Sequence, residues 1–199
     1  MANYNRDGAI AYAAQWWNSH NPAYPFYNDG NNSDCANFVS QCLYEGGGLP
    51  MKTAANNGSY DIWYFINSSN RSSSWTGAQS LRLFIKYNTV GYPRMGYTFL
   101  ANNQVGQLQK GDLVFALNGS GNKASRTAHH VAIVNSVSGN TIYVYAHSQP
   151  KGNEAWSYAL SDTILCHFDG IILTGDSSWQ ERYGSATLSQ SNNSGQYSI

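Results

Sequence analysis

The sequence predicts an α+β fold in which helices come first and an antiparallel sheet follows. Two helical patterns stand in the first quarter of the chain, near residues 7–17 and 35–45. After Lys110 the pattern changes to short segments rich in β-branched and aromatic residues, which are typical of strands. We expect a single domain over residues 1–184 and a loosely ordered Ser- and Asn-rich tail over residues 185–199.

The first predicted helix runs from about Asp7 to Trp17. Asp7 is a suitable N-cap, the residues from Ala9 to Ala14 favour propagation, and the segment from His20 to Pro25 ends the helix. A further helix is expected at Ala78 to Tyr87.

The second predicted helix begins at Cys35 and reaches about Glu45. Its buried face is indicated by residues at 3-4-3 spacing, namely Cys35, Phe38, Val39 and Cys42. Ser33 or Asp34 can cap its start, and the glycines at 46–48 end it.

The cysteine at the start of this helix has four possible roles: core thiol, half of a disulfide, metal ligand or nucleophile. The chain holds three cysteines, so at least one thiol stands outside any internal disulfide. Cys42 and Cys166 could pair in an oxidising compartment and leave Cys35 free, and the sequence alone leaves this pairing open.

Strands are predicted at Asp112–Leu117, His129–Val137 and Thr141–His147, with one or two more within Leu165–Leu173. Alternation along the second of these strands puts His130 on one face and His129 on the other. We interpret His129, which points away from His130, as a structural or surface residue.

The dipeptide Ser138-Gly139 suits a two-residue hairpin loop between the second and third strands. With that loop, His130 lies opposite His147 and the two imidazoles share one face of the sheet. A three-residue loop without a bulge would put them on opposite faces, so this pairing depends on the length of the turn.

Two aligned histidines and a cysteine at a helix start fit a nucleophilic site. A helix N-terminus and a neighbouring imidazolium both favour thiolate over thiol, and a second histidine can orient the first. On spacing alone, a core thiol at Cys35 remains an equal alternative. A zinc site made by Cys35, His130, His147 and a water is a further one.

Composition excludes several other classes of function. Charged residues make up 11% of the chain, the formal net charge is zero and no Lys/Arg cluster occurs, so we expect no nucleic-acid partner. No apolar run approaches the ~18 residues of a membrane span. The N-terminus MANYNRDGAI lacks the pattern of a signal peptide. The amide- and hydroxyl-rich composition is common among exported bacterial proteins, so we expect an extracellular or wall-associated location, reached by another route or as part of a longer exported chain.

Three motifs resemble those of the NlpC/P60-type cysteine peptidases: DCANFVSQCL at 34–43, GDLVF at 111–115 and HHVAIV at 129–134. Within that superfamily the chain is most similar to the bacterial "putative amidase" domains, which are marked by a DC-x-NFVSQ stretch. The resemblance extends from about Tyr4 to Phe168. It implies a papain-like α+β fold, with the nucleophile-bearing helix packed on a small antiparallel sheet or half-barrel.

The resemblance also implies roles for individual residues. Cys35 matches the nucleophile, His130 the general base and His147 the polar third residue of a triad. Asp34 precedes the nucleophile and is expected to cap and position its helix, while the Cys35 N–H would be an oxyanion donor. No metal or cofactor is expected.

Enzymes of this kind usually cut amide bonds in bacterial peptidoglycan. The resemblance therefore implies a cysteine-dependent amide hydrolase that acts on cell-wall peptide bonds through an acyl-enzyme. Trp63, Trp75 and Trp156 are candidates to line a substrate groove. The alternatives are acyl transfer to an amine by the same triad and a non-catalytic wall-binding or zinc-binding domain.

Overall fold

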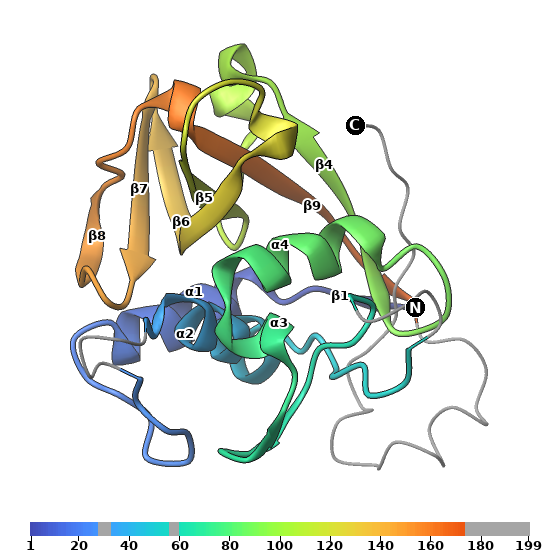
Figure 1. Cartoon of the computed structure of the whole chain (residues 1–199). Helices are drawn as coiled ribbons and strands as arrows, with labels where there is room; N and C mark the ends of the chain where they lie inside the picture. Colours follow the sequence, from blue (N-terminus) through green and yellow to red (C-terminus); the bar gives the residue numbers. More distant parts are fainter. Residues whose placement is uncertain (28–32, 56–59, 174–199) are drawn as a thin grey trace.

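The computed structural model describes residues 1–27, 33–55 and 60–173. Figure 1 shows helices gathered on one side of a curled antiparallel sheet that forms a half-barrel. This arrangement confirms the predicted α+β class. The predicted tail at 185–199 and the last residues of the predicted domain, 174–184, lie outside the described residues.

The main sheet has seven strands, and every pairing in it is antiparallel. Six of them run in the order β1 (Ala2–Asn3), β9 (Thr163–Leu173), β5 (Leu113–Asn118), β6 (Thr127–Ser138), β7 (Thr141–Ala146) and β8 (Lys151–Ala155), and β4 (Arg94–Leu100) also pairs with β9. The long strand β9 therefore joins the N-terminal and central strands. A separate small hairpin consists of β2 (Phe65–Asn67) and β3 (Asn70–Arg71).

Within the described residues, four α-helices accompany the sheet: α1 (Arg6–Trp16), α2 (Cys35–Gln41), α3 (Ser73–Thr76) and α4 (Ala78–Tyr87). A π-helical turn at Cys42–Gly46 continues α2 up to the predicted glycine stop, and short 3₁₀ turns occupy Asn102–Gln107, Lys123–Ser125 and Leu160–Asp162. The helix predicted at Ala78–Tyr87 has the predicted bounds. None of the helices in the described ranges is long and apolar enough to cross a bilayer.

The cap of α1 differs from the predicted one. Asn5 is the N-cap, and its side-chain oxygen accepts a hydrogen bond from the Gly8 N–H at 2.9 Å. Asp7 lies two residues after the cap, inside the first turn, and its carboxylate pairs with Lys110 on the surface. Asparagine and aspartate are comparable caps, so the sequence does not separate the two starts.

The sheet has an apolar core on each face. On the face toward the helices, Val131 and Ile133 of β6 pack with Phe38 and Val39 of α2. The other face has its own buried cluster, which includes Ala132, Val134, Ile142, Val144, Ala146, Trp156 and Leu165. Burial on both faces explains why β5 and the middle of β6, Val131 to Val134, are apolar almost without interruption.

The β6–β7 hairpin has a different register from the predicted one. Ser138 pairs with Thr141, so the two loop residues are Gly139 and Asn140, and Gly139 has a left-handed φ of 58°. A bulge at Asn135 then shifts the pairing, and Ile133 lies opposite Tyr145. The expectation that His130 lies opposite His147 is therefore wrong, because this register runs on to place His147 beside Val131.

A second bulge lies between β5 and β6. Ala116 pairs with His130 and Leu117 with Ala128, so His129 is an extra residue on β6. Ala128 and Val131 both face the helices across this bulge. Bulges re-aim side chains near the ends of strands, and here the bulge separates two neighbouring histidines.

A buried carboxylate ties α1 to the sheet. Asp112, just before β5, accepts hydrogen bonds from Arg6 Nη1 at 2.7 Å and from the backbone N–H groups of Gln109 and Phe168. His167 Nδ1 lies 2.7 Å from the same carboxylate. Arg6 also donates to the carbonyl of Lys110 at 2.7 Å. Charge and hydrogen bonding together therefore hold the first helix against two strands.

Candidate active site

Cys35 is the first residue of α2, which packs against β6. Its side chain is almost fully buried, and Ser33 Oγ donates a hydrogen bond to its sulfur at 3.2 Å. Burial raises the pKa of the Cys35 thiol, although hydrogen bonds from Ser33 and from the backbone of Val131 and Ala36 oppose the rise. The expectation of a lowered thiol pKa is wrong, because desolvation outweighs these contacts.

The start of the cysteine helix is held by a buried pair of side chains, Asp34 and His147. Asp34 Oδ2 lies 2.6 Å from His147 Nδ1, and both side chains are buried. Asp34 Oδ1 accepts hydrogen bonds from the Tyr27 N–H and from Asn37 Nδ2, each at 2.9 Å. The Asp34 side chain makes no capping bond to the backbone of α2. Asp34 therefore positions the helix through other side chains and the preceding segment, and the expectation that its side chain caps the helix is wrong.

His147 has acceptors at both of its ring nitrogens. Its Nε2 lies 2.8 Å from the Trp16 carbonyl, and its Nδ1 faces the Asp34 carboxylate. Because a carbonyl oxygen can only accept, the contact with Trp16 makes Nε2 a donor. The ring is stacked on Phe38 with the centroids 4.0 Å apart. Both ring nitrogens are therefore engaged by other groups of the protein.

The structure places His130 away from Cys35 and His147. Its ring stacks on Trp156 at 5.7 Å, which belongs to the core on the far face of the sheet. Its Nε2 is buried without a hydrogen-bond partner among the described residues. Burial, followed by the charges of His129 and Lys151, lowers the pKa of His130 to about 4. The expected gathering of Cys35, His130 and His147 on one face is thus not observed.

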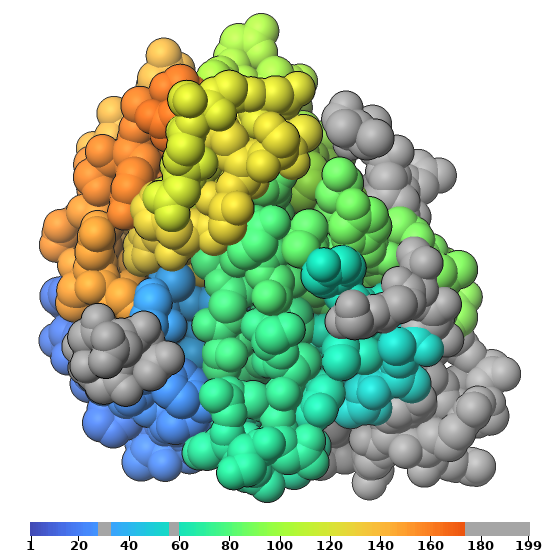
Figure 2. Space-filling model, in the orientation of Figure 1, coloured from blue at the N-terminus to red at the C-terminus, as the bar shows by residue number. Residues whose placement is uncertain are grey.

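His129 is the histidine that shares a cavity with Cys35. The cavity has a volume of about 180 Å³, and its lining consists of Tyr27, Ser33, Cys35, Arg71, Thr76, Gly77, Ala78 and His129. Figure 2 shows the face on which blue atoms from the N-terminal part of the chain meet green atoms of α3 and α4 and yellow atoms of the β5–β6 connection. Partial burial lowers the pKa of His129, so its ring is neutral at neutral pH and can accept a proton.

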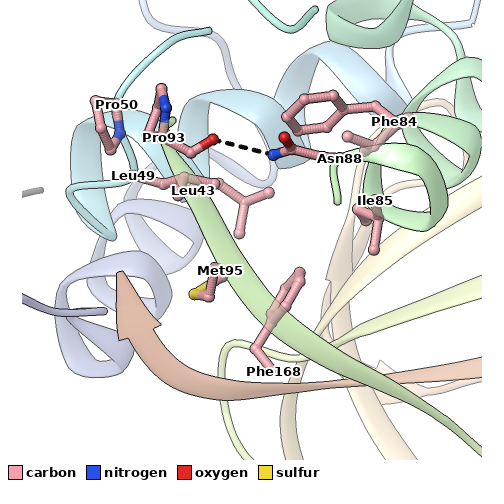
Figure 3. Close-up of a pocket in the computed structure, with 10 residues that line it drawn as sticks. Leu43, Leu49, Pro50, Phe84, Ile85, Asn88, Pro93, Met95 and Phe168 are labelled. Carbon is pink, nitrogen blue, oxygen red and sulfur yellow. Dashed lines mark hydrogen bonds between the residues drawn. The ribbon is translucent and has the colours of Figure 1, made fainter. Parts of the chain in front are cut away.

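A second cavity, between α4, β4 and the turn after α2, is of a different kind. Figure 3 shows its lining, in which Leu43, Phe84, Met95 and Phe168 supply apolar surface and Asn88 Nδ2 donates to the Pro93 carbonyl at 3.1 Å. Its volume of about 20 Å³ admits about one water molecule. This cavity is a small gap in the core and offers no nucleophile.

The three tryptophans expected to line a groove are buried. Trp63 and Trp75 are fully inaccessible and Trp156 is 9% exposed. Trp75 Nε1 donates to Asn37 Oδ1 and Trp63 Nε1 donates to Ser40 Oγ, both at 3.0 Å. Trp63 and Trp75 therefore contact the cysteine helix from inside the core. Because all three side chains are buried, the predicted role in a surface groove is wrong for them.

Several residues around the site were not singled out in the sequence. Asn37 joins Asp34, Trp75 and the Pro25 carbonyl, and its place in the DC-x-N motif was the available signal. No motif in the sequence marks Arg71, which ends the short strand β3, or Tyr27, which lies in the segment before α2. Their distance in sequence from Cys35 gave no spacing to interpret.

Neither of the other proposed roles for the cysteines finds matching geometry. Cys35, Cys42 and Cys166 are all free thiols and all buried. In the described part of the chain, no three His, Cys, Asp or Glu side chains gather in a way that could hold a metal ion. The alternative zinc site of Cys35, His130 and His147 therefore has no support from their placement.

Comparison with known proteins gives two matches. The family described as "Putative amidase domain" matches residues 3–168. "Uncharacterized protein YhbB" of Bacillus subtilis is 32% identical over 156 residues, which is 78% of this chain and 45% of that protein. The chain thus spans less than half the length of this curated relative. No solved structure matches.

Proposed function

Because the chain belongs to the "Putative amidase domain" family, we propose that it is a cysteine-dependent hydrolase of amide bonds. The observation that carries this proposal is the cavity shared by Cys35, the cysteine of the DC-x-NFVSQ motif, and His129. A thiol and a neutral imidazole at one cavity are the pair that nucleophilic acyl transfer requires. The fold we propose is papain-like, on the same resemblance.

We assign the general base to His129 in place of His130. His129 lines the cavity at Cys35, whereas the His130 ring lies against Trp156 on the far face. His147 is a positioning residue, because Asp34 engages its Nδ1 and the Trp16 carbonyl engages its Nε2, which leaves neither nitrogen for the thiol. The proposed pair is therefore Cys35 and His129, with Asp34 and His147 fixing the helix that carries the thiol.

The proposed reaction proceeds in two stages. His129 takes the thiol proton as Cys35 Sγ attacks the amide carbonyl carbon, and the Cys35 N–H donates to the developing oxyanion. The His129 imidazolium then protonates the leaving amine as the C–N bond breaks, which leaves a thioester on Cys35. In the second stage, His129 deprotonates a water that attacks the thioester carbonyl. The products are a carboxylic acid and the free thiol.

We propose bacterial peptidoglycan peptides as the substrate and the cell wall or its surroundings as the location. The resemblance to NlpC/P60-type enzymes supports both, as does a surface solubilised by amides and hydroxyls rather than by charge.

Digestion of purified peptidoglycan, with the released fragments identified by mass, tests the function and the bond together. The wild-type protein is expected to release peptide fragments with a new amine and a new carboxylate. Cys35→Ser should reduce the rate at least a thousandfold while leaving the fold intact. Equal digestion by both proteins would refute a cysteine mechanism. Fragments joined to an added amine would instead identify acyl transfer.

A further inference from the structure

The cavity at Cys35 is lined by a cation that has one buried, unpaired donor among the described residues. Arg71, at the end of β3, lines the cavity, and its Nε is buried without a hydrogen-bond partner among the described residues. The Arg71 guanidinium lies over the Tyr27 ring, 5.0 Å from its centroid. Tyr27 lines the same cavity, and its hydroxyl is likewise buried and unpaired within the described ranges.

No carboxylate of the described residues neutralises Arg71. Arg71 takes part in none of the salt bridges of the described residues. Asp34 is close enough to raise the pKa of Tyr27, but its carboxylate is engaged by His147 and Asn37. A buried donor without a partner is unfavourable by about 1–3 kcal/mol, which a ligand oxygen would recover. Arg71 and Tyr27 therefore bring a positive charge and a hydroxyl group to the cavity, and both groups suit an anionic ligand.

The geometry of these groups selects the ligand. A guanidinium presents its N–H groups in a planar fork that matches the two oxygens of a carboxylate. Burial raises the pKa of Tyr27, so its hydroxyl remains a hydrogen-bond donor at neutral pH. Arg71 and Tyr27 line the same cavity as Cys35, so a ligand held by them lies beside the cysteine.

We propose that Arg71 and Tyr27 form a carboxylate-binding subsite, so that the preferred substrate carries a free carboxylate next to the amide bond that is cut. This inference rests on the proposed function and names its substrate class: acidic peptides. The subsite orients the substrate and takes no part in proton transfer. Arg71 is thus a specificity-determining residue.

The first experiment measures the subsite without any enzymatic turnover. Cys35 is alkylated with iodoacetate, which carries a carboxylate, and with iodoacetamide, which is its neutral analogue. The ratio of the two rates cancels any change in thiolate fraction, because both reagents react with the same thiolate. Cys35→Ser identifies background reaction at the two other cysteines.

Arg71→Gln is expected to lower the iodoacetate-to-iodoacetamide ratio at least tenfold, and Arg71→Lys to lower it less. Tyr27→Phe, which keeps the ring beneath the guanidinium, should lower the ratio about threefold. Lys86→Gln is the matched control, because Lys86 also lies over a tyrosine ring but outside this cavity. An unchanged ratio in Arg71→Gln and Tyr27→Phe would overturn the subsite.

The second experiment compares two peptides that differ only in a carboxylate or a carboxamide beside the scissile bond. The wild-type protein should have at least a tenfold higher kcat/KM for the carboxylate peptide, and Arg71→Gln should abolish that preference. A preference that persists in Arg71→Gln would also overturn the inference. If neither peptide is cleaved, the proposed function fails, and the alkylation ratio alone decides whether the subsite exists.

Discussion

Two adjacent histidines, His129 and His130, have different environments although they are neighbours in the chain. The bulge between Ala128 and His130 leaves His129 at the Cys35 cavity and directs His130 into the far core. Both rings contact Tyr158, with centroid distances of 5.4 and 6.0 Å. A one-residue displacement of the bulge would exchange their positions. Single substitutions of the two histidines therefore test which of them is the base.

Single alanine substitutions of the two histidines should have unequal effects on amide hydrolysis. His129→Ala is expected to lower kcat/KM by about 10²-fold or more, because a general base typically contributes that much. His130→Ala should lower it less than tenfold when the rate is corrected for folded protein. Steady-state kinetics on a peptide substrate measures both. The opposite order would return the base to His130.

The buried ring of His130 should make stability depend on pH. The unfolded state takes up a proton near pH 6.5, whereas the folded state resists until its pKa of about 4. The folded state therefore loses stability as the pH falls from above 6.5 to 4, by about 3 kcal/mol for this group. Urea unfolding at pH 7 and pH 4 measures the loss.

His130→Phe is the control for this pH effect, because it keeps a ring against Trp156 and removes the titration. Between pH 7 and pH 4, the unfolding free energy of the wild-type protein should fall by about 3 kcal/mol more than that of the variant. Parallel pH curves for the two proteins would show that His130 is not buried as a neutral ring.

The cysteine helix α2 owes its position to polar contacts as much as to its apolar face. Asp34 and His147 join its start to the end of β7 and to the Trp16 carbonyl. Ser148 Oγ accepts a hydrogen bond from the Asp34 N–H at 2.6 Å. From inside the core, Trp63 and Trp75 donate to Ser40 and Asn37. The helix is thereby fixed at both its polar start and its middle.

Breaking the Asp34–His147 pair from one side should destabilise the protein strongly. His147→Phe leaves the buried Asp34 carboxylate without its partner, which costs about 3–5 kcal/mol. The double variant Asp34→Asn, His147→Phe should lose less than the sum of the two single losses, with a coupling of about 0.5–3 kcal/mol. Denaturant unfolding of the four proteins gives this coupling, and strict additivity would contradict the ion pair.

At the scale of the whole molecule, the helical layer and the sheet meet through Asp112. This carboxylate is fully buried and receives Arg6 from α1, His167 from β9 and two backbone N–H groups. Its recorded partners include none of the residues to which we assign a catalytic role. Its role is to hold the layers together.

Asp112→Asn should therefore lower stability without altering the chemistry. We expect a loss of about 3 kcal/mol or more in unfolding free energy, because Arg6 loses its buried partner. Alkylation of Cys35 by iodoacetamide in the folded protein should keep its rate. Asp7→Asn is the matched control: its pair with Lys110 is exposed, so the loss should stay below about 1 kcal/mol. Equal losses in the two variants would contradict this account of Asp112.

The sequence by itself determined the helices and strands that depend on residues close together in the chain. The helix at Ala78–Tyr87, the helix start at Cys35 and the strands now labelled β5, β6, β7 and β9 follow from periodicity and residue type. The strand β4 was missed because the residues that stabilise it, on β9, are distant in the chain. The DC-x-NFVSQ motif also carried the family, through residues that stand next to one another.

Only the tertiary structure decided which histidine stands at the thiol. Two bulges, at His129 and Asn135, each shift the strand pairing by one residue, and a shift of one residue changes the face on which a side chain lies. The same holds for Arg71 and Tyr27, which line the Cys35 cavity from β3 and from the segment before α2. Local propensities contain no record of such contacts, because the contacts form only when the helical layer packs on the sheet.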